Sequence, residues 1–92
     1  MEVKWLDKGL SDFQYFMKRD RKKAQKIGSL IDDILQNGVD KGIGKPEQLK
    51  YDYSGCYSRR IDEKNRLVYY IDNIDGEDVL VILACRYHYG DK

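Results

Sequence analysis

The chain has 92 residues, of which 36% are charged and 41% hydrophobic, and this globular composition excludes a low-complexity or disordered protein. Its length predicts one domain over residues 1–92. The formal net charge of +1, taken as a total, argues against binding nucleic acid through bulk charge.

The N-terminal half predicts a short strand followed by two amphipathic helices. The strand candidate is Val3–Leu6, and a first helix is expected from Gly9 to Arg19. The apolar stripe of this helix is predicted at Leu10, Phe13 and Met17, with Phe16 beside it. Asp20 is the expected N-cap of the second helix, and Gly38 follows its end. The apolar face of the second helix repeats with a period of 3.6 residues at Ala24, Ile27, Leu30, Ile31 and Ile34.

The second half has the pattern of strands and turns. The predicted elements, in order, are a loop at Gly42–Pro46, a turn at Tyr53–Gly55, a strand at Tyr57–Asp62, a turn at Glu63–Asn65, a strand at Arg66–Ile71, a loop at Asn73–Asp78 and a strand at Val79–Tyr87. The last strand is so apolar that we expect it at the centre of the sheet, covered on both faces.

Helices followed by a run of strands indicate an α+β fold. The two helices should cover one face of a mainly antiparallel sheet, in the order β-α-α-β-β-β. The longest apolar run, Val79–Cys85, is far shorter than the ~20 residues of a membrane span. Because the N-terminus also lacks a signal-peptide pattern, we expect a cytoplasmic protein with reduced thiols. Two cysteines and one histidine are too few for a structural zinc site, so no metal and no cofactor are expected.

The near-neutral total hides separate charged segments. Residues 18–26 hold six basic side chains and one acidic one. Without further context, a solvated helix face is the favoured explanation of such a run. A second basic group lies in or beside the predicted sheet, at Lys45, Lys50, Arg59, Arg60, Arg66 and Arg86. Acidic residues gather instead in one hairpin loop, at Asp72, Asp75, Glu77 and Asp78. A basic sheet face would suit phosphate groups.

The segment Arg86-Tyr87-His88-Tyr89 follows the last apolar strand. If the strand continues, Arg86 and His88 share one face, and Tyr87 and Tyr89 share the other. His88 is then either an ordinary surface histidine or a proton donor near neutral pH.

Five motifs in order resemble the YoeB/Txe toxins of the RelE-type superfamily. They are Gly44-Lys45-Pro46-Glu47-x-Leu49-Lys50, Ser54-Gly55, Ser58-Arg59-Arg60-Ile61, Arg66-Leu67-Val68-Tyr69 and Ala84-Cys85-Arg86-Tyr87-His88-Tyr89. The resemblance implies a RelE-like fold and a toxin of a type II toxin-antitoxin system. It further implies a ribosome-dependent endoribonuclease, or mRNA interferase, that cuts mRNA in the A site of the 70S ribosome and inhibits translation.

The resemblance also implies site residues and partners. Glu47 would be the general base, His88 the general acid, and Arg66 the stabiliser of the scissile phosphate. RNA-binding roles would fall to Lys50, Arg59, Arg60, Arg86 and Tyr89. The implied partners are mRNA, the ribosome, a YefM/Axe-type antitoxin and a second copy of the chain. Operator DNA would be bound only through the antitoxin complex.

Another function remains open on the same residues. A non-catalytic module with this basic surface could bind the ribosome or an antitoxin and act by occupancy or as a transcriptional co-repressor. The tyrosine pairs could be ordinary cross-strand packing or could stack exposed bases.

Overall fold

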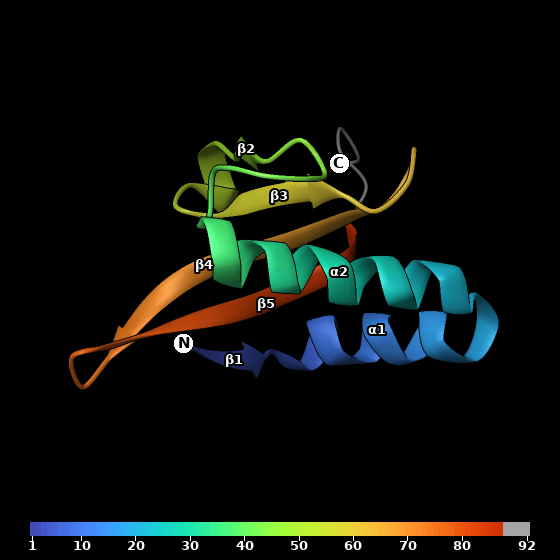
Figure 1. Cartoon of the computed structure of the whole chain (residues 1–92), viewed down its shortest axis with the longest axis horizontal. Helices are drawn as coiled ribbons and strands as arrows, with labels where there is room; N and C mark the ends of the chain where they lie inside the picture. Colours follow the sequence, from blue (N-terminus) through green and yellow to red (C-terminus); the bar gives the residue numbers. More distant parts are fainter. Residues whose placement is uncertain (88–92) are drawn as a thin grey trace.

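The structure is a computed structural model that describes residues 1–87. Its elements are β1 (Glu2–Trp5), α1 (Asp7–Arg19), α2 (Arg21–Asn37), β2 (Glu47–Gln48), the 3-10 turn η1 (Tyr51–Tyr53), β3 (Tyr57–Arg60), β4 (Arg66–Ile74) and β5 (Glu77–Tyr87). The five strands form one sheet in the order β1-β5-β4-β3-β2, and α1 and α2 lie together on one of its sides (Figure 1). Only the β1–β5 pair is parallel among the described strands, which confirms the mainly antiparallel α+β fold.

The second helix buries the face that its sequence predicts. Ile27, Leu30, Ile31 and Ile34 of α2 are all buried in the main core, between the helices and the sheet. Asp20 caps α2 by accepting a hydrogen bond from the Lys23 backbone N–H, and Gly38 closes the other end. None of the helices within residues 1–87 is long and apolar enough to cross a bilayer.

The buried face of α1 differs from the predicted stripe. Gly9, Asp12 and Phe16 are buried, whereas Leu10 and Met17 are 42% and 50% exposed. The helix is turned this way because Gly9 lets its backbone approach β5 closely: a Cβ at Gly9 would lie 2.5 Å from the carbonyl oxygen of Ile82. The periodicity of apolar residues could not predict that a polar residue, Asp12, lies inside the packed face.

The long hairpin β4–β5 replaces much of the predicted loop at Asn73–Asp78. Strand β4 continues to Ile74 and β5 begins at Glu77, so the turn consists of Asp75 and Gly76 alone. Both turn residues have positive φ angles, 54° and 86°, as a tight two-residue hairpin turn requires. The Asp-Gly pair is the sequence signal for this turn.

The sheet has β4, not β5, as its middle strand, although β5 lies inside the sheet between β1 and β4. Side chains of β5 are buried on both faces, as predicted. Leu80 and Ile82 join the main core beneath the helices, while Ala84 packs with Leu49 and Val68 in a small second core on the other face. The segment that carries β2 and η1 thus covers the face opposite the helices.

Candidate functional site

Glu47 and Arg66 meet on the sheet face opposite the helices. Glu47 lies on β2, a two-residue edge strand that pairs with β3, although the sequence placed it just after a loop. Arg66 is the first residue of β4. Its Nη1 atom lies 3.7 Å from Oε1 of Glu47. The Arg66 side chain is 9% exposed and that of Glu47 is 42% exposed, so a buried cation holds an accessible carboxylate.

Strand β3 places Ser58 and Arg60 on the same face. Ser58 lies opposite both Glu47 and Val68 in the ladder, and its Oγ accepts a hydrogen bond of 3.4 Å from Arg66 Nη1. Arg60 pairs directly with Arg66 and is exposed. Ser58 is fully buried and positions Arg66, a role that the sequence analysis missed. The only signal for Ser58 was its place in the strand two residues before Arg60, which puts both on one face.

Lys50 and two tyrosines border this face. Lys50 is exposed and precedes η1. The rings of Tyr53 and Tyr87 meet edge to face, with their centroids 5.2 Å apart. Leu49 anchors the segment by packing in the second core and by donating its backbone N–H to the Cys56 carbonyl. The basic residues Lys50, Arg60 and Arg66 therefore lie on or beside the surface that carries Glu47.

Arg59, predicted to hold RNA, does not lie on this surface, and its side chain is not exposed to a ligand in this structure. Its side chain is fully buried on the helix side of the sheet. Its guanidinium donates to the hydroxyl of Tyr69 and the carboxylate of Asp33. It also donates to backbone carbonyls of the loop between α2 and β2, at Gly38, Lys41 and Ile43.

This buried arginine fixes the loop that leads to Glu47. Tyr69 donates its hydroxyl to the carbonyl of Val39, at 2.6 Å, and Asp33 accepts the Ile43 backbone N–H at 3.1 Å. The hydrogen bond from Arg59 holds the pKa of Asp33 below its ordinary value, and burial raises the pKa of Tyr69. We call these three residues, Arg59, Asp33 and Tyr69, the loop anchor.

Arg86 lies on the other side of the sheet from Glu47. Its Cζ atom is 3.7 Å from the ring centroid of Tyr15 on α1, whereas the neighbouring Tyr87 contacts Tyr53 on the opposite face. The backbone N–H groups of Cys85 and Arg86 both donate to Oδ2 of Asp12, at 2.9 and 3.1 Å. Asp12 thereby fixes the end of β5, and it lies off the predicted apolar stripe of α1, so the periodicity carried no signal for it.

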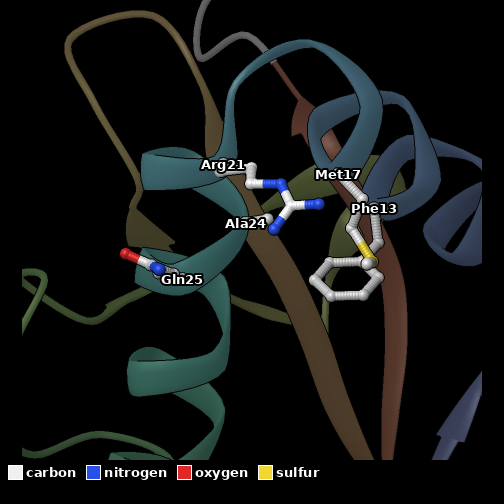
Figure 2. A pocket seen from close by; sticks show the side chains of 5 residues that line it. All are labelled: Phe13, Met17, Arg21, Ala24 and Gln25. Carbon is white, nitrogen blue, oxygen red and sulfur yellow. The ribbon is translucent and has the colours of Figure 1, made fainter.

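The remaining predicted site residues, His88 and Tyr89, lie outside the described residues. Within residues 1–87 no three side chains of His, Cys, Asp or Glu gather where they could hold a metal ion. A separate pocket of about 210 Å³ lies between the helices. Figure 2 shows its lining, where Phe13 and Met17 of α1 face Arg21 of α2. None of its lining residues, which also include Ala24 and Gln25, belongs to the Glu47 face.

Comparison with known proteins gives a consistent result. A family model described as "YoeB-like toxin of bacterial type II toxin-antitoxin system" matches residues 5–89. The chain is 42% identical over 89 residues to Toxin YoeB of Escherichia coli K12, covering 97% of this chain and 100% of that one. Two Staphylococcus aureus structures, a YoeB-YefM complex and a YoeB dimer, are each 39% identical, with TM-scores of 0.84 and 0.85. In both cases the match covers 97% of this chain and 98% of the solved one.

Proposed function

The chain belongs to the YoeB-like toxins of bacterial type II toxin-antitoxin systems, and on this basis we propose that it is a ribosome-dependent endoribonuclease. Its substrate would be mRNA in the ribosomal A site, and cleavage would stop translation in the cytoplasm. The observation that carries the proposal is the contact between the buried Arg66 and the accessible carboxylate of Glu47. Residues 1–92 would act as one toxin domain.

The proposed chemistry uses the 2′-hydroxyl of RNA as the nucleophile. Glu47 removes the 2′-proton, and the 2′-oxygen forms a bond to the adjacent phosphorus. The bond from phosphorus to the 5′-oxygen then breaks, and His88 protonates that oxygen. The products are a 2′,3′-cyclic phosphate and a 5′-hydroxyl end, and no metal or cofactor takes part. An acid or base placed in this way contributes about 10²–10⁴-fold to the rate.

Arg66 supports both the base and the transition state. Because its guanidinium is nearly buried, its charge acts in a region of low dielectric constant, where electrostatic stabilisation of a developing phosphorane is strongest. Ser58 fixes the orientation of the same group. Lys50, Arg60 and Tyr89 would bind the RNA backbone or bases beside the scissile phosphate.

Primer extension on mRNA in a translating extract tests the proposal. Wild type should produce discrete cuts, and Glu47→Gln should reduce the cutting rate by about 10²–10⁴-fold. Glu63→Gln is the matched control, since it removes an exposed carboxylate from the β3–β4 turn. Equal cutting by wild type and Glu47→Gln would refute the role of Glu47. Inhibition of translation without any cut would favour the non-catalytic alternative, in which the toxin acts by occupancy.

The solved relatives support the proposed partners. One S. aureus relative was solved as a YoeB-YefM complex and another as a YoeB dimer. We propose that this chain likewise binds a YefM-type antitoxin, forms a homodimer, and meets operator DNA only through the antitoxin complex. Light scattering of the chain alone and of a mixture with its antitoxin would measure both assemblies.

A further inference from the structure

A second basic site lies on the helix side of the sheet, near the start of β4 and the end of β5. It is an open pocket of about 440 Å³. Its walls come from α1, the α1–α2 junction, the β3–β4 turn and β5. The lining residues are Tyr15, Phe16, Arg19, Asp20, Lys23, Lys64, Asn65 and Arg86. None of them belongs to the Glu47 face, so the pocket is separate from the proposed catalytic residues.

The ring of Tyr15 holds two guanidinium groups at this pocket. The Cζ atom of Arg86 lies 3.7 Å from the ring centroid, and that of Arg19 lies 4.7 Å from it. An aromatic face attracts cations, and it leaves the N–H groups at the guanidinium edge available to a ligand. Within residues 1–87 neither arginine has a carboxylate in ion-pair contact.

The charge at the pocket remains positive after its ion pairs are counted. Lys23 lies between two carboxylates, 3.3 Å from Asp20 and 3.2 Å from Asp62, and is neutralised by them. Arg19, Lys64 and Arg86 add three positive charges, and the two carboxylates outweigh Lys23 by one negative charge, so the net charge of these six groups is +2.

We propose that this pocket binds a backbone phosphate of RNA at a nucleotide away from the scissile bond. The inference rests on the proposed function, because it extends the RNA path of that site. Two pairs of adjacent residues link the pocket to the Glu47 face. In the first, Asn65 lines the pocket and its neighbour Arg66 contacts Glu47. In the second, Arg86 lines the pocket and its neighbour Tyr87 pairs with Arg66 in the sheet. RNA passing over this end of the sheet meets both surfaces, and arginine forks match phosphate oxygens.

The test is binding of a fluorescein-labelled 12-nucleotide RNA by full-length protein, measured by anisotropy over a range of salt concentrations. All variants carry Glu47→Gln, so that the RNA is not cut. The double variant Arg19→Gln/Arg86→Gln should bind at least about tenfold more weakly at low salt. The slope of log affinity against log salt should fall by about 0.7, since each phosphate contact to single-stranded RNA contributes about 0.7.

Two further variants separate this pocket from bulk charge and from misfolding. Lys4→Gln/Lys22→Gln removes the same charge from exposed positions outside the pocket and should keep the wild-type slope within about 0.3. Arg19→Lys/Arg86→Lys keeps the charge but loses the planar forks, so it should keep most of the slope and still bind more weakly. Circular dichroism and urea unfolding confirm that each variant is folded.

Failure of this inference is distinct from failure of the proposed function. Equal binding and slope for Arg19→Gln/Arg86→Gln and the lysine control would overturn the phosphate pocket, even if wild type cuts mRNA. No measurable RNA binding by the parent protein at low salt would also overturn it. The same holds if Arg19→Gln/Arg86→Gln loses binding to an acidic antitoxin peptide but keeps its binding to RNA. Selective loss of RNA binding would support the pocket even if wild type makes no cuts in the translating extract.

Discussion

Removing the guanidinium of Arg59 should destabilise the whole fold, although arginine is normally a surface residue. Arg59→Leu leaves three loop carbonyl oxygens without their donor, at Gly38, Lys41 and Ile43. An unsatisfied buried acceptor costs about 1–3 kcal/mol, and because these carbonyls belong to exposed residues, each should fall near the low end, about 3 kcal/mol for the three. We therefore expect a loss of about 3 kcal/mol, the lower end of the range found when one partner of a buried ion pair is removed.

Urea unfolding followed by circular dichroism measures this loss. A domain of this length has a total stability of about 5–14 kcal/mol, so Arg59→Leu removes a large part of it and should lower the urea midpoint by more than about 1 M. Arg60→Leu is the matched control, since it deletes the same charge one residue later in β3, at an exposed position. Its free energy of unfolding should stay within about 0.5 kcal/mol of wild type.

The comparison of the two variants decides the matter. Equal midpoints for Arg59→Leu and Arg60→Leu would refute the role of the loop anchor. A larger loss for Arg60→Leu than for Arg59→Leu would show that the face assignment of β3 is wrong.

Three other results follow from the packing and the titrating groups. Gly9→Ala should lower the free energy of unfolding, because its Cβ would meet the β5 backbone. The Cβ of Gly28→Ala meets no described atom within 4 Å, so this variant should raise the free energy of unfolding by about 0.5–1 kcal/mol. Thermal unfolding measures both, and a loss of stability in both variants would contradict the close approach at Gly9. Burial acts to raise the pKa of Asp62, but its hydrogen bonds outweigh this and lower it from 3.8 to about 2, so stability present above pH 4 should be lost as the pH falls toward 2. Asp62→Asn should remove that acid-dependent part, about 2 kcal/mol, and an unchanged pH profile would argue against it. Burial raises the pKa of Cys85 to about 12, so at pH 8 iodoacetamide should label the partly exposed Cys56 first. Mass spectrometry of the digested protein measures the order of labelling, and faster labelling of Cys85 would disprove its burial.

The alternation of β3 illustrates how far the sequence can predict this fold. Tyr57-Ser58-Arg59-Arg60 identifies a strand, and a period of two places the two arginines on opposite faces. It cannot tell which arginine points into the protein, since burial of Arg59 depends on Asp33 and on loop carbonyls distant in sequence. The apolar face of α2 was predictable because four branched aliphatic residues repeat there without a competing pattern.

The candidate site was predictable only where local motifs carried it. Glu47 and Arg66 were identified through their resemblance to a family, and the fold brings these two together across β3. The positions of Asp12 and Ser58 could not be predicted, because each is fixed by hydrogen bonds to another element, Asp12 to two N–H groups of β5 and Ser58 to Arg66 of β4. Arg86 was placed in a strand correctly, but its partner ring on α1 depends on how the helix is rotated.

The parallel pair of β1 and β5 has a consequence for biosynthesis. It joins Glu2 to Val79, so β1 finds its neighbour only after the helices and β2 to β4 have been made. Both helices emerge early and must keep their apolar faces uncovered until β4 and β5 follow. Formation of such long-range pairs is slow, and uncovered apolar surface favours aggregation. A newly made molecule therefore cannot complete its sheet until β5 has left the ribosome.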